Sequence, residues 1–140
     1  MIDLSSTSGA QQWLGGAYPA AGVLARADWV ASHQATVQKV VDAIVATMHW
    51  LATHSAADVA NVLPPSFVSN ALVTKATYIS TLATDKSQFL PNGIMPADGP
   101  TVIMAISKLA GVITGPVNLP ATYTNSYAMT ANKLLGLPAS

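Results

Sequence analysis

The longest periodic stretch of the chain covers residues 27–54. Apolar residues recur there at steps of three and four, which places them along one stripe of an α-helix. Asp28 and Ser32 are both candidate N-caps. We therefore expect a short turn from Asp28, a break near Ser32 and His33, and a long helix to about His54. Such a stripe usually packs in a core and carries no chemistry; here it comprises Val37, Val40, Val41, Ile44, Val45, Met48, Leu51 and Ala52.

The segment before this helix has a weaker pattern. Residues 1–4 are consistent with a short strand, and residues 11–14 with a helical turn that ends at a glycine-rich bend, residues 15–19. Residues 20–27 are mostly apolar, and this pattern predicts a short buried strand that leads into the long helix.

Behind the long helix, the pattern predicts four shorter helices separated by proline and glycine residues. Ser55 and Asp58 form a start that resembles a capping box, and Asp98 is a candidate N-cap further along the chain. We find no internal repeat or low-complexity tract. The expected helices begin at Ser55, within residues 66–90, at Asp98 and at Thr122. The last of them covers residues 122–135, with Gly136 as its C′ residue and Pro138 as its stop.

The composition indicates one domain with an unusually uncharged surface. Of the 140 residues 51% are hydrophobic and 9% are charged, with a net charge of +0, whereas soluble domains carry about 25% charged residues. The few cations are scattered, which argues against a nucleic-acid partner. No apolar run reaches the length of a transmembrane helix, about 18 residues, and the first residues do not resemble a signal peptide. Exposed apolar patches would favour a homo-oligomer.

The residues that carry chemistry form no recognisable catalytic motif. His49 and His54 fall on different faces of the long helix, and the chain has neither Glu nor Cys, so we expect no metal site. Nucleophile-elbow, phosphate-loop and dinucleotide motifs do not occur. We expect no cofactor, and a binding role is favoured over an enzymatic one. A hydrolytic Ser/His pair stays open as an alternative, because its members need not be close in sequence.

The best candidate for a small-molecule site lies near the N-terminus. Thr7, Ser8, Trp13 and Tyr18 combine hydroxyl groups with aromatic surface around the glycine-rich bend. Mostly apolar pockets with a few polar groups are lined in this way. The same residues are also typical of a packed Trp and Tyr next to a turn.

The order of several segments resembles a known family. A strand-like GVLARADWV is followed by the long helix, then by GIMPADGPTVIMAISKLA and finally by VNLPATYTNSYAMTANKLLG. The most specific pieces are Asn118–Leu119 with the TYTN segment, residues 122–125, and the helix entry at Asp98 and Gly99. In this order they resemble the C-terminal part of periplasmic solute-binding proteins of ABC importers, in the branch that binds sulfonates, taurine, nitrate and pyrimidine precursors.

The resemblance implies a mainly α fold with one or two short strands, equivalent to part of a two-lobed α/β type II binding protein. Residues 1–27 would belong to the second lobe and the crossover strand, and residues 28–140 to the helical layer of the first lobe. The chain would be a fragmentary periplasmic binding protein that binds a sulfonate- or pyrimidine-like ligand weakly or only with its other half, with an ABC permease as partner. No charged residue lies between Asp3 and Arg26, so this side offers an anionic ligand no ion pair. A self-associating helical interaction module is a further alternative.

Overall fold

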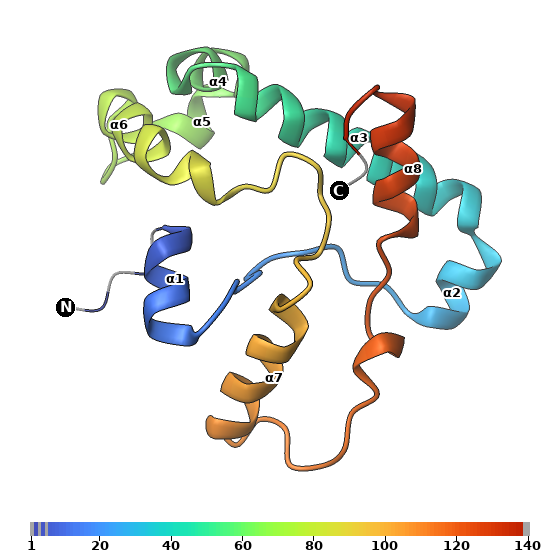
Figure 1. Ribbon diagram of the computed structural model, residues 1–140. Coiled ribbons are helices and arrows are strands. Elements are labelled where there is room, and N and C mark those ends of the chain that lie inside the picture. Colours follow the sequence, from blue (N-terminus) through green and yellow to red (C-terminus); the bar gives the residue numbers. More distant parts are fainter. Residues whose placement is uncertain (1, 3, 5, 139–140) are drawn as a thin grey trace.

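The computed structural model describes residues 2, 4 and 6–138, and this part of the chain is mainly α-helical (Figure 1). None of these residues lies in a β-strand. The helices are α1 Thr7–Leu14, α2 Ala27–Ser32, α3 Gln34–Thr53, α4 Ala56–Val62, α5 Pro65–Val68, α6 Lys75–Asp85, α7 Gly99–Leu109 and α8 Ser126–Leu134, with two 3₁₀ turns, η1 Lys86–Gln88 and η2 Leu119–Ala121.

The predicted break in the long helical stretch is confirmed. His33, with φ −128° and ψ 34°, separates α2 from α3. The proposed N-caps are wrong, because Asp28 and Ser32 both lie inside α2. The Ser32 hydroxyl donates backward to the carbonyl of Asp28 at 2.9 Å. Arg26 and His33 occupy the N-cap positions of α2 and α3, and neither side chain makes a hydrogen bond to the helix that follows it.

The largest contact between helices joins α3 and α8, which lie against each other in Figure 1. Val45 of α3 is 1% exposed and packs against Ala128 and Ala131 of α8. The turn before α7 approaches closely, since a Cβ on Gly93 would lie 3.0 Å from Cγ2 of Val45. Gly93 also has a φ of +63°, which favours glycine. This small cluster is the centre of the fold.

A second group consists of α4, α5, α6 and η1 at the other end of α3 (Figure 1). The capping box predicted at Ser55 is confirmed: its hydroxyl accepts from the Asp58 amide, and the Asp58 carboxylate accepts from the Ser55 amide, both at 3.1 Å. Pro65 does not only stop the preceding helix. It starts α5, because proline fits the first position of a helix.

The strand predicted over residues 20–27 is wrong. Residues 20–25 are exposed and form no hydrogen bond with the described part of the chain, and Ala27 already begins α2. An isolated extended segment has no ladder partner, so its apolar composition alone does not make it a strand. Of the strand predicted over residues 1–4, Met1 and Asp3 lie outside the described residues, and Ile2 and Leu4 are in no regular element.

The first helix, α1, is longer than the predicted turn over residues 11–14. The Ser6 hydroxyl accepts from the Gly9 amide at 3.1 Å and caps α1, which therefore begins at Thr7. At the other end Gly15, with a φ of +78°, provides the left-handed residue that terminates the helix.

Two side chains tie α7 and α8 to distant segments. Asp98 precedes α7 as predicted, but its carboxylate accepts from the amide of Ala17 at 3.0 Å and makes no cap bond. Asn125 precedes α8; its Oδ1 accepts from the amide of Met95 at 2.9 Å and its Nδ2 donates to the Met95 carbonyl at 3.3 Å. The last helix therefore begins at Ser126 and not at residue 122.

The surface of the molecule is large for its mass. It measures 9534 Å², whereas a compact folded chain of this mass exposes about 6,800 Å². Along the apolar stripe of α3 only Val45 is buried, while Val40 is 44% and Ile44 is 37% exposed. The helices are thus well formed, but much of their apolar surface is not covered by the rest of the chain.

Candidate functional site

The four residues predicted to line a site lie in α1 and in the loop that follows it. Thr7 and Ser8 are in the first turn of α1, and the Ser8 hydroxyl lies 3.1 Å from that of Ser6. Trp13 is 50% and Tyr18 is 42% exposed. Thr7 and Trp13 are separated by about 9 Å along the helix axis at 1.5 Å per residue. The two hollows described below have other linings, so a binding role for these four residues stays a prediction.

The structure draws attention to a short recurrence that our search for repeats missed. The ends of α2 and α3 have the sequences WVASH, residues 29–33, and WLATH, residues 50–54. In both, the His ring stacks on the Trp ring four residues earlier. The ring centroids are 4.7 Å apart for Trp29 and His33, and 4.2 Å apart for Trp50 and His54. The pattern could have been found by aligning the two helix ends.

The same backbone groups are bonded at both helix ends. Nδ1 of His33 lies 3.0 Å from the Trp29 carbonyl oxygen, and Nδ1 of His54 lies 2.8 Å from the Trp50 carbonyl oxygen. A carbonyl oxygen can only accept, so Nδ1 carries the proton in both rings. Each His ring thereby bonds a carbonyl in the last turn of the helix that it ends; the Trp50 carbonyl also accepts from the His54 amide at 3.1 Å. These are two matched C-terminal caps.

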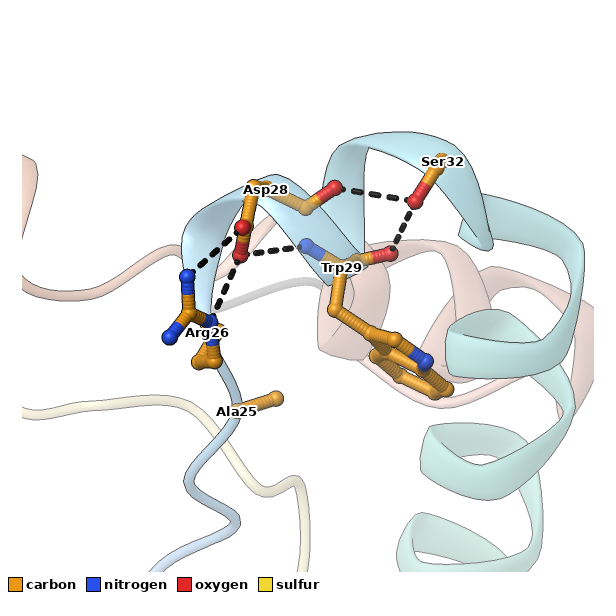
Figure 2. Close-up of a pocket in the computed structure, with 5 residues that line it drawn as sticks. All are labelled: Ala25, Arg26, Asp28, Trp29 and Ser32. Atoms are coloured by element: carbon orange, nitrogen blue, oxygen red, sulfur yellow. Dashed lines mark hydrogen bonds and ion pairs between the residues drawn. The ribbon is translucent and has the colours of Figure 1, made fainter.

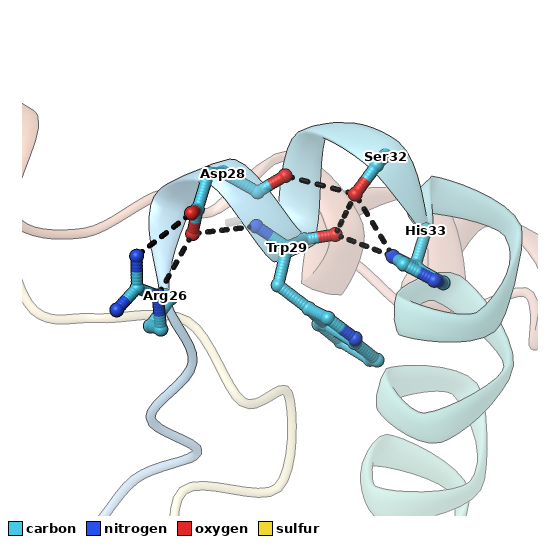
Figure 3. Close-up of polar contacts among 5 residues, drawn as sticks. All are labelled: Arg26, Asp28, Trp29, Ser32 and His33. Carbon is cyan, nitrogen blue, oxygen red and sulfur yellow. Dashed lines mark hydrogen bonds and ion pairs between the residues drawn. The ribbon is translucent and has the colours of Figure 1, made fainter.

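This protonation bears on the idea of a Ser/His hydrolase. The Ser32 hydroxyl lies 2.9 Å from Nδ1 of His33, which resembles a nucleophile next to its base. However, that nitrogen already carries its proton, and the hydroxyl itself donates to the Asp28 carbonyl (Figure 3). Nδ1, the ring atom that faces the Ser32 hydroxyl, therefore has no free lone pair for the Ser32 proton. The Ser32–His33 contact is therefore part of the C-terminal cap of α2 and not a nucleophile–base pair.

The first hollow lies at the beginning of α2 and has a volume of about 570 Å³. Figure 2 shows the Arg26 guanidinium bonded to the Asp28 carboxylate at its edge, with the Trp29 ring on the opposite side. The remaining lining residues are Ala25 and Ser32. The Arg26 and Asp28 side chains are 84% and 67% exposed, and ion pairs between exposed groups contribute little free energy. This hollow is shallow, and its charged groups bond each other.

Hydrogen bonds to three exposed charged groups set their pKa values. The Arg26 side chain, followed by the Trp29 amide, lowers the pKa of Asp28 below its ordinary value, and the same ion pair raises the pKa of Arg26. At the capping box, the Ser55 hydroxyl and then the Ser55 amide lower the pKa of Asp58. Both carboxylates are therefore ionised at neutral pH.

The second hollow is an apolar groove of about 530 Å³, and we call it the α3–α4–α6 groove. Its volume is in the range of small-molecule sites, about 300–1,000 Å³. None of its lining side chains is charged, and three are aromatic. Nζ of Lys86 donates to the carbonyl of His54 and joins η1 to the end of α3. The lining residues are Thr47, Trp50, Leu51, Val59, Val62, Leu63, Tyr78, Leu82 and Phe89.

The groove suits an apolar occupant. Its side chains offer hydrophobic surface, and their polar groups are the hydroxyls of Thr47 and Tyr78 and the indole N–H of Trp50. The Thr47 hydroxyl already donates to the Ala43 carbonyl at 2.7 Å. Within the described ranges, no three His, Cys, Asp or Glu residues are close enough to hold a metal ion. No helix of the described structure is long and apolar enough to span a membrane.

Comparison with known proteins gave no match to this chain among protein-family models, curated proteins or solved structures.

Proposed function

We propose that this chain is the helical layer of a solute-binding protein of the ABC-importer type, and that it binds a small organic ligand only together with further polypeptide. The observation that carries the proposal is the uncovered apolar surface. The 9534 Å² of exposed area is roughly 2,700 Å² more than a compact chain of this mass exposes. A layer of helices built to pack on a sheet has this property when the sheet is not present.

The extended segment before α2 supports the same proposal. Residues 20–25 run across the molecule between α1 and α2 without a hydrogen-bonding neighbour among the described residues (Figure 1). A crossover strand removed from its sheet would keep its apolar side chains and lose its ladder. The TYTN segment and the Asp98–Gly99 helix entry, on which the family resemblance rests, lie just before α8 and at the start of α7.

Titration calorimetry with taurine and with a hydroxymethylpyrimidine tests this proposal. We expect no measurable heat from the chain alone. Fusion to the sheet-bearing first part of a sulfonate-binding protein should give a saturable signal with at least one of the two ligands. Tight binding by the chain alone, or a folded fusion that binds neither ligand, would contradict the proposal.

The same fusion tests the predicted site residues. Replacement of Trp13 or Tyr18 by Ala should weaken binding at least tenfold if these aromatic side chains face the ligand. Phe67→Ala is a matched control, because Phe67 is 71% exposed in α5 and does not belong to the predicted site. Equal affinities for all three variants would remove these two residues from the site.

A further inference from the structure

One dipeptide beside the central α3–α8 contact can change chemically without an enzyme. Asn92 is the one Asn of the chain that Gly follows. Asn side chains are chemically labile, and the backbone nitrogen of the next residue can attack their Cγ atom. A following Gly favours this attack, because it has no side chain in the way and its backbone is permissive. The attack closes a five-membered succinimide ring and releases ammonia. Water then opens the ring and leaves Asp or isoaspartate.

We propose that Asn92 is a site of spontaneous deamidation and that the packing of α8 on α3 controls its rate. Both reacting groups are engaged in the folded chain. The Gly93 amide donates to the Leu90 carbonyl at 3.1 Å, and Oδ1 of Asn92 accepts from the Ile94 amide, also at 3.1 Å. The Gly93 nitrogen must lose its proton to close the ring, so the reaction breaks the hydrogen bond to Leu90. The closed turn therefore opposes deamidation.

A buried side chain of α8 holds the turn closed. Asn132 is 0% exposed, and its Nδ2 donates to the Asn92 carbonyl at 2.9 Å. Oδ1 of Asn132 has no partner among the described residues, so the bond to Asn92 is the one that satisfies this buried amide. A buried polar group that loses its partner is costly. Asn132 therefore favours the closed turn as long as α8 stays packed on α3.

The same contacts are incompatible with the isoaspartate product. In isoaspartate the main chain runs through the former side chain, which adds one methylene group to the turn. Gly93 already lies against α3, since a Cβ on it would be 3.0 Å from Cγ2 of Val45. Close-packed interiors respond to a volume change of even one methylene. The longer turn therefore displaces the contact at Val45 or the bond to Asn132, and we expect the modified chain to hold α8 less firmly.

Peptide mapping by mass spectrometry during incubation at mildly alkaline pH tests the site and its control by the fold. Acid should accumulate at Asn92 before any other Asn when the chain is unfolded in urea, and at least tenfold more slowly in the folded chain. Equal rates in the two states, or an unfolded chain in which another Asn reacts first, would overturn the proposal. No ligand takes part, so the result is independent of the proposed solute binding.

Two variants separate the local contact from overall stability. Asn132→Leu has a similar shape but no donor for the Asn92 carbonyl, and it should raise the rate at Asn92 at least threefold over the folded parent. Thr74→Ala is the matched control, because it removes the cap that accepts from the Thr77 amide at 3.1 Å at the start of α6. It should leave the rate unchanged. An unchanged rate in Asn132→Leu, or the same increase in both variants, would refute control by α8.

Aged parent protein tests the consequence without a substitution. Deamidation adds a negative charge, so anion exchange separates the modified chain from the fresh one. Amide hydrogen exchange in α8, Ser126–Leu134, should be at least tenfold faster in the modified chain, whereas exchange in α6 should stay the same. Unchanged exchange in α8 would show that the turn and the helix are not coupled, and the proposal would then be wrong.

Discussion

The ends of α2 and α3 have nearly the same five residues and the same cap, but they lie in different surroundings. In both, a His donates to the Trp carbonyl four residues earlier and stacks on its ring. Trp29 borders a shallow hollow and is 42% exposed, whereas Trp50 is more buried and lines the α3–α4–α6 groove. Local sequence therefore sets the way a helix ends, and distant segments determine whether its aromatic residue also holds the fold together.

The two Trp residues should differ most in their contribution to stability. We expect Trp50→Ala to lower the free energy of unfolding by about 2 kcal/mol, less than the 3–5 kcal/mol of a fully buried Trp because the residue is only partly buried. Trp29→Ala should cost about 0.5 kcal/mol, as expected for an exposed site. Urea unfolding followed by circular dichroism measures both values.

Trp13→Ala is the control for this pair, because Trp13 is 50% exposed and takes part in neither cap. Its effect should be close to that of Trp29→Ala. Equal losses in the free energy of unfolding for Trp29→Ala and Trp50→Ala would mean that the packing of Trp50 in the groove adds no stability beyond that of the helix cap.

The His residues should show a smaller difference. His54→Ala removes a ring stack and a hydrogen bond, and we expect a cost of about 1–2 kcal/mol from the two together. His33 is more exposed, so His33→Ala should lower the free energy of unfolding by about 0.5 kcal/mol. His54→Phe keeps an aromatic ring but not the Nδ1–H donor. Its free energy of unfolding should therefore lie between that of the parent and that of His54→Ala.

Urea unfolding at pH 7.5 gives these values, and hydrogen exchange in the last turn of α3 shows whether the helix end frays. A His54→Phe variant as unstable as His54→Ala would assign the effect to the hydrogen bond alone. A variant as stable as the parent would assign it to stacking.

These comparisons also show what the sequence alone could predict. The long helix α3, the break near His33 and the capping box at Ser55 all depend on residues within a few positions, and all three predictions are confirmed. The core packing expected of the apolar stripe of α3 is wrong for most of its length, because only Val45 is buried. The strand over residues 20–27 was wrong because a strand requires a neighbour that no local pattern specifies. The start of α8 was wrong because Asn125 bonds to Met95, thirty residues away.

The groove could not be predicted for a similar reason. Its lining comes from α3, α4, α6 and Phe89, and no single stretch carries its pattern. The nearest signal was the recurrence of Trp and His at two helix ends. This recurrence marks Trp50 as the Trp of a Trp–His pair at a helix end, but it does not indicate which helices cover Trp50. The expected site at Thr7, Ser8, Trp13 and Tyr18 was chosen from neighbours in sequence, and the structure places these residues along one exposed helix and its loop.

The smallest expected effect concerns acid. The folded-state pKa values of Asp28 and Asp58 are lowered, so each carboxylate stabilises the fold above the ordinary pKa of Asp, about 3.9. This contribution is lost as the pH falls through the lower folded-state value. Ser55→Ala removes the main cause at Asp58, and Arg26→Gln removes the main cause at Asp28.

Urea unfolding of the parent and of both variants between pH 7 and pH 2 measures this dependence. Each variant should lose less stability than the parent on acidification, and the difference should be small because both carboxylates are exposed and screened by water. A steeper loss in Ser55→Ala than in the parent would contradict the sign of the shift at Asp58.

The large exposed surface also determines the thermal behaviour of a single copy. Relative to an extended chain, the fold removes about four-fifths of the area that a compact 140-residue domain would bury. The heat capacity of unfolding follows this area, so it should be about 1.5 kcal/mol/K instead of the usual value of about 1.9 kcal/mol/K for this length. The monomer should therefore have a flatter stability curve and a broader thermal transition. When the apolar faces become covered, calorimetry should show a larger heat capacity of unfolding and a narrower transition.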